Sequence, residues 1–119
     1  MSNFASVEAE QAVLGSMLID SGCVRRVAAI LRESDFSVAL NQDLYRVIVT
    51  MDRDGQPIDG LTVCAEALRQ SLAEEKTLRK YLAQLMEITP TAANVAEYAE
   101  IVAGTARRRE LKTALEDGL

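Results

Sequence analysis

The apolar and polar positions along the 119-residue chain alternate with the period of an α-helix. In most segments apolar residues recur three, four and seven positions apart, which places them on one helical face. The clearest stripe is Leu44, Val47, Ile48 and Met51. The run at 47–51 could form a strand by itself, but it lies within this helical period. The pattern therefore predicts helices and no convincing strand.

Capping and turn residues divide the chain into about six predicted helices. Gly55 and Pro57 are placed to end the third helix, and Pro90 to end the fifth. Gly15 inside the first helix costs about 1 kcal/mol relative to Ala, which indicates close packing against a neighbour. The first expected helix is capped by Ser6 and has Glu8 and Glu10 in its first turn, and the second places Val24, Val27, Ala28 and Leu31 inward. The third is capped by Asn41, and the fourth starts at Asp59 or Thr62. The fifth is capped by Thr77, and a long sixth helix runs from Thr91 towards Leu115. The sequence predicts an all-α fold, a compact irregular bundle with short connections and a long last helix.

Composition agrees with this prediction and narrows the function. Apolar residues make up 49% of the chain, with Ala and Leu dominant and few aromatics, which favours helix. The net charge of -5 argues against an overall basic footprint for DNA or RNA. Arg107, Arg108, Arg109 and Lys112 form a local basic cluster. This cluster is open to two interpretations, a nucleic-acid contact or a solvated last helical turn in which cations face the negative end of the helix dipole.

Cysteine usage and the N-terminal segment indicate a cytoplasmic protein. Cys23 and Cys64 are isolated and the chain has no His, so a zinc site is not expected. We predict two reduced, mostly buried thiols in a cytosolic protein. The first residues lack the basic start and unbroken apolar run of a secretory signal, and no run approaches the ~20 residues of a membrane span.

No motif in the chain predicts catalysis, a metal site or a cofactor site. Asp52 and Asp54 fit the first positions of a calcium loop, but Pro57 stands where Gly is needed and Val63 where a bidentate Glu is needed. The chain contains no P-loop motif for nucleotide phosphates. A helix-turn-helix would need a basic recognition helix, whereas the candidate helices begin neutral or acidic. The expected role is therefore that of a surface for partners.

The sixth predicted helix carries two lengthwise seams. Val95, Ala99, Val102 and Ala106 form an inner seam that can pack on the bundle. At about 100° per residue a second seam lies roughly a quarter turn away. The alternative is a single broad core face with Tyr98 at its edge. The second seam is the candidate protein-interaction surface: Asn94, Tyr98, Ile101, Thr105 and Arg108.

Four stretches occur in an order that is typical of one family. They are VEAEQAVLGSMLID near the start, DF at 35–36, GQPID at 55–59 followed by LTV, and ITPTAANVAEYAEIV before the long helix. Over residues 7–111 the sequence resembles the N-terminal domain of bacterial DnaB-type replicative DNA helicases. There are two departures. Asn41–Tyr45 stands where many relatives carry a His-Arg pair, and AEEKTLRK replaces a link that often contains Gly.

The resemblance implies a collar domain of a hexameric ring helicase that unwinds DNA at the replication fork. It implies a helical head over residues 7–90 and, over 91–119, the first arm of a truncated helical hairpin whose second arm would follow Leu119. The implied partners are other copies of the chain (dimer, and hexamer in the full-length protein), the primase C-terminal domain, a helicase loader, and DNA through the full-length ring. ATP and Mg²⁺ would bind a separate motor domain, which makes the full-length protein an ATP-dependent 5′–3′ helicase and this domain non-catalytic.

Two other interpretations remain open from the sequence. The first is a nucleic-acid-binding helical module that uses Arg107–Lys112, for which binding should collapse with rising salt. The second is the helicase-binding domain of primase, which has a related helical architecture. The stretch EAEQAVLG favours the helicase over the primase.

Overall fold

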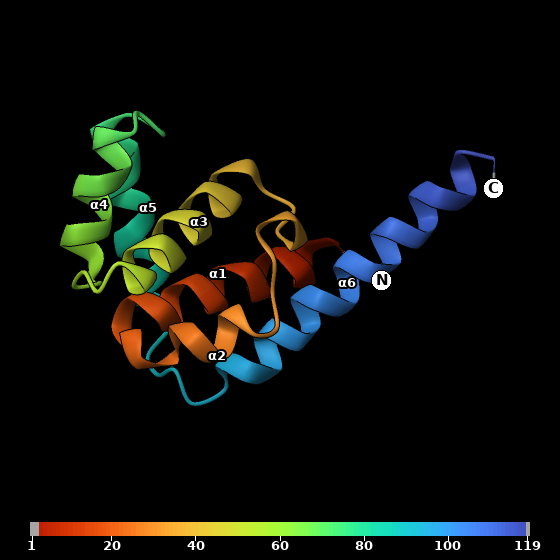
Figure 1. Cartoon of the computed structure of the whole chain (residues 1–119), viewed down its shortest axis with the longest axis horizontal. Coiled ribbons are helices and arrows are strands. Elements are labelled where there is room, and N and C mark those ends of the chain that lie inside the picture. The colour runs from red at the N-terminus through yellow and green to blue at the C-terminus, as the bar shows by residue number, and fades with distance from the viewer. Residues whose placement is uncertain (1–2, 119) are drawn as a thin grey trace.

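The computed structural model describes residues 3–118, and all regular structure in this part of the chain is helical. The predicted all-α fold with a long last helix is confirmed (Figure 1). In chain order the elements are α1 (Asn3–Ile19), the 3-10 turn η1 (Ser21–Cys23), α2 (Val24–Ala28), the 3-10 turn η2 (Glu33–Asp35), α3 (Ala39–Arg53), α4 (Gly60–Arg69), α5 (Glu75–Glu87) and α6 (Val95–Glu116).

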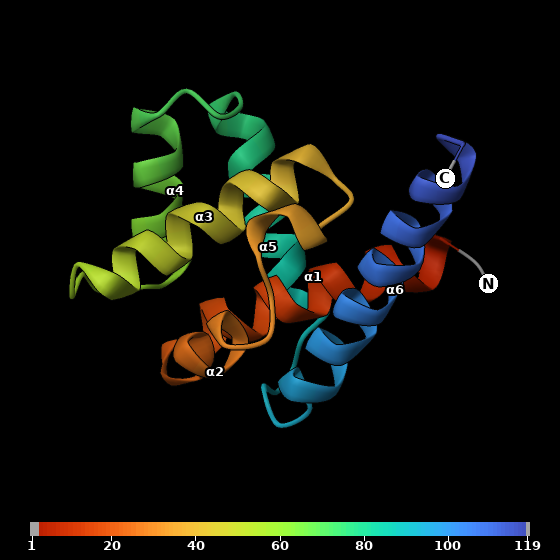
Figure 2. The same ribbon diagram turned by 45° about the vertical axis from the view of Figure 1, so that its right-hand side comes forward.

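Helix α1 lies at the centre of the molecule. It packs against α6, α5 and α3, and Figures 1 and 2 show it between α3 and the crossing α6. A helix with partners on several sides needs apolar residues around its circumference, and Val13, Leu14, Met17 and Leu18 are all buried. The core of the head is therefore organised around the first helix of the chain.

Gly15 allows α1 and α5 to approach closely. A Cβ at this position would overlap the Leu85 carbonyl oxygen and the Thr89 hydroxyl. The Thr89 hydroxyl donates a hydrogen bond of 2.8 Å to that same carbonyl, which holds the end of α5 in place. The close packing predicted for Gly15 is confirmed.

Helix α3 follows its predicted stripe and its predicted stop. Leu44, Val47, Ile48 and Met51 are buried, as the spacing requires. At the C-terminal end Gly55 adopts φ +72°, a left-handed conformation that glycine adopts without strain. The N–H groups of residues 55 and 56 donate to the carbonyls of Asp52 (3.1 Å) and Met51 (2.9 Å). This is the Schellman arrangement in which a glycine ends a helix.

Several predicted helix starts are wrong by two to four residues. Helix α1 already begins at Asn3, so Ser6 lies inside it instead of capping it, and Glu10 lies beyond the first turn. Asn41 lies inside α3, which begins at Ala39. Asn41 has other side-chain partners inside the helix, Glu10 and Tyr81, whereas the buried Ser6 hydroxyl has no hydrogen-bond partner among the described residues.

The starts of the later helices give a mixed outcome. Asp59, one of the two predicted starts, caps α4: its carboxylate accepts from the Thr62 N–H (2.8 Å), and the Thr62 hydroxyl accepts from the Asp59 N–H (2.9 Å). Thr77 does not cap α5, which starts at Glu75. Thr91 accepts from the Ala93 N–H (3.1 Å) and forms a turn, so α6 begins only at Val95.

The second helix is shorter than its stripe suggested. Helix α2 ends at Ala28, which is exposed, although Leu31 in the following segment is buried as predicted. Cys23 and Cys64 are free and buried, in agreement with the predicted thiols. Burial raises the pKa of the Cys23 thiol, which keeps it protonated at neutral pH.

Helix α6 gives the molecule its elongated shape, with principal extents of 44 × 30 × 26 Å. Its N-terminal part runs along the head, and its C-terminal part extends beyond the other helices (Figure 1). Within residues 3–118, none of the helices combines the length and apolar character needed to cross a membrane. The division into a head over 7–90 and a hairpin arm over 91–119 stays a prediction.

Candidate protein-interaction surface

The inner seam of α6 attaches this helix to the head. Val95, Ala99, Val102 and Ala106 have no exposed area, which confirms the predicted packing face. Two of the four are Ala, and small residues let helix α6 lie close to α1, its main partner. The buried inner seam fixes which side of α6 faces outward.

The five residues predicted as an interaction surface are not equally accessible. Asn94, Ile101 and Arg108 are exposed, with Ile101 retaining 43% of its surface. Tyr98 is half-buried against the core. Thr105 is also half-buried, and its hydroxyl makes no hydrogen bond within the described residues. The predicted seam therefore marks the border between the packed face and the open face of α6.

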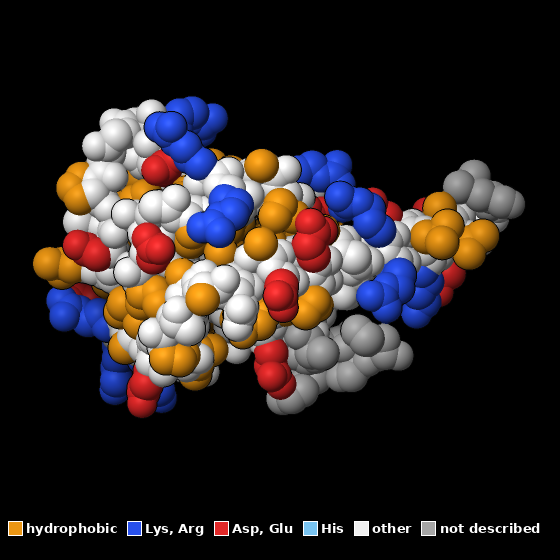
Figure 3. Space-filling view, turned by 90° about the horizontal axis from the view of Figure 1, so that it is seen from below, with side chains coloured by type: hydrophobic (Ala, Val, Ile, Leu, Met, Phe, Trp, Pro, Cys, Tyr) orange, Lys and Arg blue, Asp and Glu red, His pale blue; other side chains and the backbone are white. Residues whose placement is uncertain are grey.

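The most apolar part of the open face extends further along α6 than the predicted seam. Leu111 and Leu115 are 62% and 65% exposed. With Ile101, Gly104 and Arg108 they recur at spacings of three and four residues, and at about 100° per residue they lie roughly half a turn from the inner seam. We call these five residues the outer α6 stripe. Figure 3 shows apolar side chains gathered towards the C-terminal end of α6, flanked by basic ones.

Part of the basic cluster binds within the molecule. The Arg107 guanidinium lies 3.4 Å from the buried Asp35 carboxylate, and the Arg109 guanidinium donates to the Asp35 carbonyl (3.1 Å). Asp35 also accepts from the Arg32 N–H (2.8 Å). The interpretation of the cluster as a solvated last turn is wrong, because these residues precede the end of α6 and two of them connect it to η2.

The two remaining cations of the cluster face solvent. Among the described residues, no carboxylate lies within 4.0 Å of the Arg108 or Lys112 side-chain nitrogens. Both are exposed, and Arg108 belongs to the outer α6 stripe. The open face therefore combines exposed apolar side chains with two available positive charges, which is typical of protein-interaction surfaces.

The fully buried carboxylate of Glu10 has a structural role. One of its oxygens accepts from the Ser37 N–H (2.8 Å) and hydroxyl (2.6 Å), and the other accepts from the Asn41 amide (2.9 Å). The Asn41 carbonyl oxygen accepts from the Tyr81 hydroxyl (2.5 Å). Burial raises the pKa of Tyr81, so this hydroxyl stays protonated as a donor. The chain of hydrogen bonds connects α1, α3 and α5.

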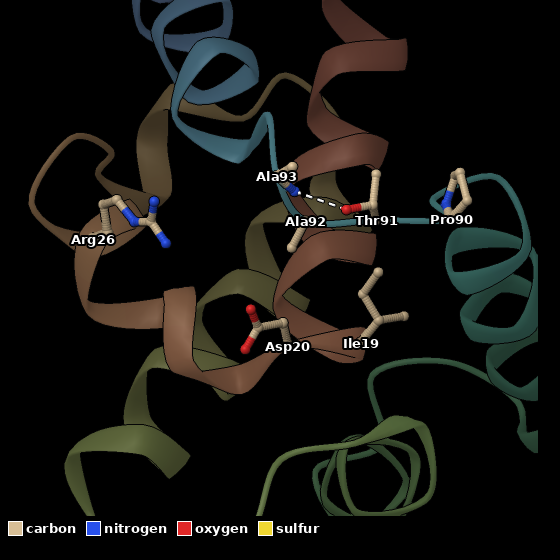
Figure 4. Close-up of a pocket in the computed structure, with 7 residues that line it drawn as sticks. All are labelled: Ile19, Asp20, Arg26, Pro90, Thr91, Ala92 and Ala93. Atoms are coloured by element: carbon tan, nitrogen blue, oxygen red, sulfur yellow. Dashed lines mark hydrogen bonds between the residues drawn. The ribbon is translucent and has the colours of Figure 1, made fainter.

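A hollow on the head lies beside the segment that precedes α6. It is an open groove of about 600 Å³, formed by the end of α1, by Arg26 of α2 and by residues 90–93 (Figure 4). Asp20 faces this groove, and its carboxylate accepts from the Gly22 N–H (3.1 Å). The groove has mixed chemistry and holds no combination of nucleophile and base. Among the described residues, no three His, Cys, Asp or Glu side chains are placed to hold a metal ion.

Comparison with known proteins decides the family. The model of the DnaB-like helicase N terminal domain matches residues 2–104. The chain belongs to this family. The resemblance found in the sequence is thereby confirmed, and the helices described above are those of a DnaB-like N-terminal domain.

Replicative helicases from several bacteria are relatives of this DnaB-like domain. The chain is 38% identical over 110 residues to the replicative DNA helicase DnaB of Geobacillus stearothermophilus. The aligned region covers 92% of this chain and 24% of that protein. It is 40% identical over 106 residues to DnaB of Mycobacterium leprae, covering 89% of this chain and 18% of that protein. The chain thus spans a quarter or less of the length of these relatives.

Solved structures of DnaB N-terminal domains share the fold. The domain from Mycobacterium tuberculosis is 38% identical, covers 92% of this chain and 79% of its own, and superposes with a TM-score of 0.85. The domain of the Helicobacter pylori helicase, described together with its interactions with primase, superposes with a TM-score of 0.80. It is only 18% identical and covers 94% of this chain and 87% of its own, so it shows the fold alone.

Sequence reasoning missed two parts of this DnaB-like domain that matter for its surface. Leu111 and Leu115 were not included, although Leu115 continues the seven-residue spacing of Ile101 and Arg108, and Leu111 lies three residues after Arg108. The role of Asp35 was also missed, because its partners lie 72 and 74 residues away in the sequence. The first signal could have been read from the sequence, and the second required the fold.

Proposed function

We infer that this domain is the non-catalytic assembly and primase-interaction part of a hexameric replicative DNA helicase that unwinds duplex DNA at the replication fork. The observation that carries the proposal is the division of α6 into a fully buried inner seam and an outer α6 stripe in which the apolar side chains of Ile101, Leu111 and Leu115 are exposed. A helix with one face in the core and another apolar face in solvent is suited to bind a further helix. The relatives named as replicative helicases supply the biological setting.

The proposal assigns the chemistry to another part of the full-length protein. ATP and Mg²⁺ bind a motor domain outside this sequence, which drives 5′–3′ unwinding, and DNA passes through the assembled ring. The protein works in the cytoplasm. The isolated chain should therefore not hydrolyse ATP, since its sequence has no P-loop. Turnover that persists through repurification and follows the protein peak would contradict this assignment.

The first role proposed for the α6 surface is contact between copies of the chain. The isolated chain should be a folded monomer that dimerises weakly, because a single stripe buries little apolar area. Sedimentation velocity over a wide concentration range measures this equilibrium. Tyr98→Ala and Ile101→Asp should weaken the dimer more than they weaken folding. A strict monomer at the highest soluble concentration would remove self-association from the role of this fragment.

The second role proposed for the α6 surface is binding of the primase C-terminal domain, with a helicase loader as a further candidate partner. Tyr and Arg are frequent at energetic hot spots, and Tyr98 and Arg108 lie at the border of the open face. Arg108 and Lys112 should govern the association rate and its salt dependence, whereas the apolar side chains should govern residence time.

The experiment is a titration of labelled primase C-terminal domain into the full-length protein, the isolated chain, and the full-length Tyr98→Ala, Arg108→Glu variant. We expect the double variant to lose affinity about tenfold or more. Lys76→Glu on α5, an exposed cation on another helix, is the control and should bind like the unmodified protein. Equal affinity of the double variant and the control would place the primase site elsewhere. No binding to the full-length ring would leave assembly as the only role.

A further inference from the structure

Helix α6 consists of two parts that are held to the rest of the molecule by different forces. The buried residues of α6 end at Ala106, and from residue 107 to residue 116 every side chain of the helix is at least partly exposed. We call residues 107–116 the distal segment of α6. It extends beyond the other helices in Figure 1, and its direction is not fixed by a buried apolar face.

Polar contacts with η2 hold the distal segment instead. The Asp35 carboxylate has no exposed area, and it lies 3.4 Å from the Arg107 guanidinium and 3.6 Å from that of Arg32. Arg109 donates to the Asp35 carbonyl (3.1 Å), and the Glu110 carboxylate lies 3.2 Å from the Arg32 guanidinium. We call these five residues the η2–α6 cluster. Because Arg32, Arg107 and Glu110 are exposed, salt screens their pairs, whereas it does not weaken the apolar inner seam.

The space between η2 and the distal segment is incompletely filled. An open hollow of about 540 Å³ is lined by Ser34 of η2 on one side and by residues of α6, among them Thr113 and Ala114, on the other. Close-packed interiors resist displacement, because moving one side chain disturbs its neighbours. The distal segment has no such packing against η2, so it can move relative to η2 without disrupting the core.

Gly104 lies just before the distal segment, where the two parts of α6 meet. A Cβ at this position would have the Arg108 guanidinium as its nearest neighbour at 3.8 Å, which is an ordinary contact distance. Packing within the chain therefore does not require a glycine here, in contrast to Gly15, where a Cβ would overlap α5. Glycine weakens the interior of a helix because it has more conformational freedom than Ala, and bends occur where glycine stands beside a hydroxyl residue.

Thr105 is the hydroxyl residue beside this glycine. Its hydroxyl is buried and makes no hydrogen bond within the described residues. A Thr hydroxyl inside a helix can donate to the carbonyl four residues earlier, here that of Ile101, and this bond bends the helix. Bending at this point would therefore give a partner to a buried polar group that lacks one in the observed conformation.

We propose that Gly104 and Thr105 form a hinge in α6 and that the η2–α6 cluster holds the distal segment in the observed, closed position. Raised salt weakens the cluster and releases the distal segment, which then pivots as a helix. The closed position keeps the outer α6 stripe in one line, whereas pivoting turns Leu111 and Leu115 away from it. The hinge belongs to the single chain and does not depend on the partners proposed above.

The motion can be measured in the complete chain with two spin labels and pulsed electron spin resonance. Lys76→Cys on α5 and Leu115→Cys on the distal segment provide exposed labelling sites, whereas the native Cys23 and Cys64 are buried. The width of the distance distribution between the labels reports how freely the distal segment moves relative to the head.

The cluster variant for this measurement is Arg107→Gln, Glu110→Gln, which removes both ion pairs of the distal segment without changing the net charge. The matched control is Lys112→Gln, Glu116→Gln. It makes the same charge change on the distal segment, at two exposed residues that form no ion pair among the described residues.

We expect a narrow distribution for the labelled chain and the control at low salt, and one about twofold or more wider for the cluster variant. Raised salt should widen the distribution of the labelled chain towards that of the cluster variant. Adding Gly104→Ala to the cluster variant should narrow the distribution again, because Ala fits this position and restricts the backbone. Circular dichroism should show the same helix content in the labelled chain, the control and the cluster variant.

Three results would overturn the proposal. Equal widths for the cluster variant and the control would show that the cluster does not hold the distal segment. A width that Gly104→Ala leaves unchanged would show that the bend does not occur at this glycine. A wider distribution accompanied by a loss of helix content would show that the distal segment unwinds from its end and does not pivot.

Discussion

Ile101 and Val102 are neighbours in the chain, but they belong to two different regions of α6. Val102 lies in the inner seam with no exposed area, whereas Ile101 begins the outer α6 stripe and keeps 43% of its surface exposed. Both are β-branched aliphatic residues of similar polarity. Apolar character alone therefore does not distinguish a residue that stabilises the fold from one that is free to bind a partner. The two residues differ because α1 packs against only one side of α6.

The largest difference should come from placing the same charge at these two neighbours. Val102→Asp buries a carboxylate without a partner and should lower the free energy of unfolding by more than about 3 kcal/mol. Ile101→Asp should lower it by less than about 1 kcal/mol, because its side chain can reach water. Urea denaturation followed by circular dichroism measures both values. Similar losses at the two positions would mean that the outer α6 stripe is part of the core.

The second largest effect concerns the core of the head, which should lose stability at alkaline pH. Burial, with the nearby Asp35 charge as a smaller cause, raises the pKa of Tyr45 from 10.0 to about 12. The folded state thus keeps the phenolic proton to higher pH than the unfolded chain does. The resulting stabilisation is complete below pH 10 and is lost as the pH rises to about 12, by roughly 2 kcal/mol.

Unfolding free energies measured at several alkaline pH values test this expectation, with Tyr45→Phe as the control. The Phe variant is less stable at neutral pH because it lacks the hydrogen bond to Leu31, but it should lose less stability between pH 10 and 12. Parallel curves for the two proteins would show that Tyr45 does not titrate as its burial implies.

A smaller effect should follow from Asp35→Ala, which removes the carboxylate between η2 and α6. The Arg32 N–H and the Arg107 guanidinium then lose an acceptor, at a cost of about 1 kcal/mol. Hydrogen exchange should increase in η2 and in α6 from residue 107 onward, and change little at residues 95–106, which are held by apolar burial. Equal increases along all of α6 would show that the two halves are not held independently.

The smallest effect on stability should come from the far end of the outer α6 stripe. Leu111→Ser and Leu115→Ser remove exposed side chains and should change the free energy of unfolding by less than about 0.5 kcal/mol. The same double variant should nevertheless shift any dimer towards monomer in sedimentation velocity. A clear loss of thermal stability without a change in association would reverse the roles assigned to the two regions.

Features that depend on residues close in sequence could be predicted. The stripe of α3, its stop at Gly55 and the cap at Asp59 each involve residues within one or two helical turns, so local rules suffice. The inner seam of α6 was predicted for the same reason. The predicted seam through Tyr98 was only partly informative, because its position relative to the head depends on how α6 rotates against α1.

Features that depend on distant partners were missed. Glu10 was expected in a charged first turn, but its partners Ser37 and Asn41 lie 27 and 31 residues further along the chain. Thr91 was expected to cap α6, but a Thr hydroxyl satisfies a turn as well as a helix end, and the local sequence does not decide between them. Long-range polar contacts become visible only when the chain is folded.

The central position of α1 has a consequence for how the chain acquires its structure during synthesis. This helix precedes the other helices of the domain and leaves the ribosome before them, yet two of its main partners, α5 and α6, begin only at residues 75 and 95. Contacts of such long sequence separation form late, because a long loop must close before they stabilise the fold. The apolar circumference of α1 therefore stays exposed until almost the whole domain has been translated, and during that interval it is the segment most suited to bind a chaperone.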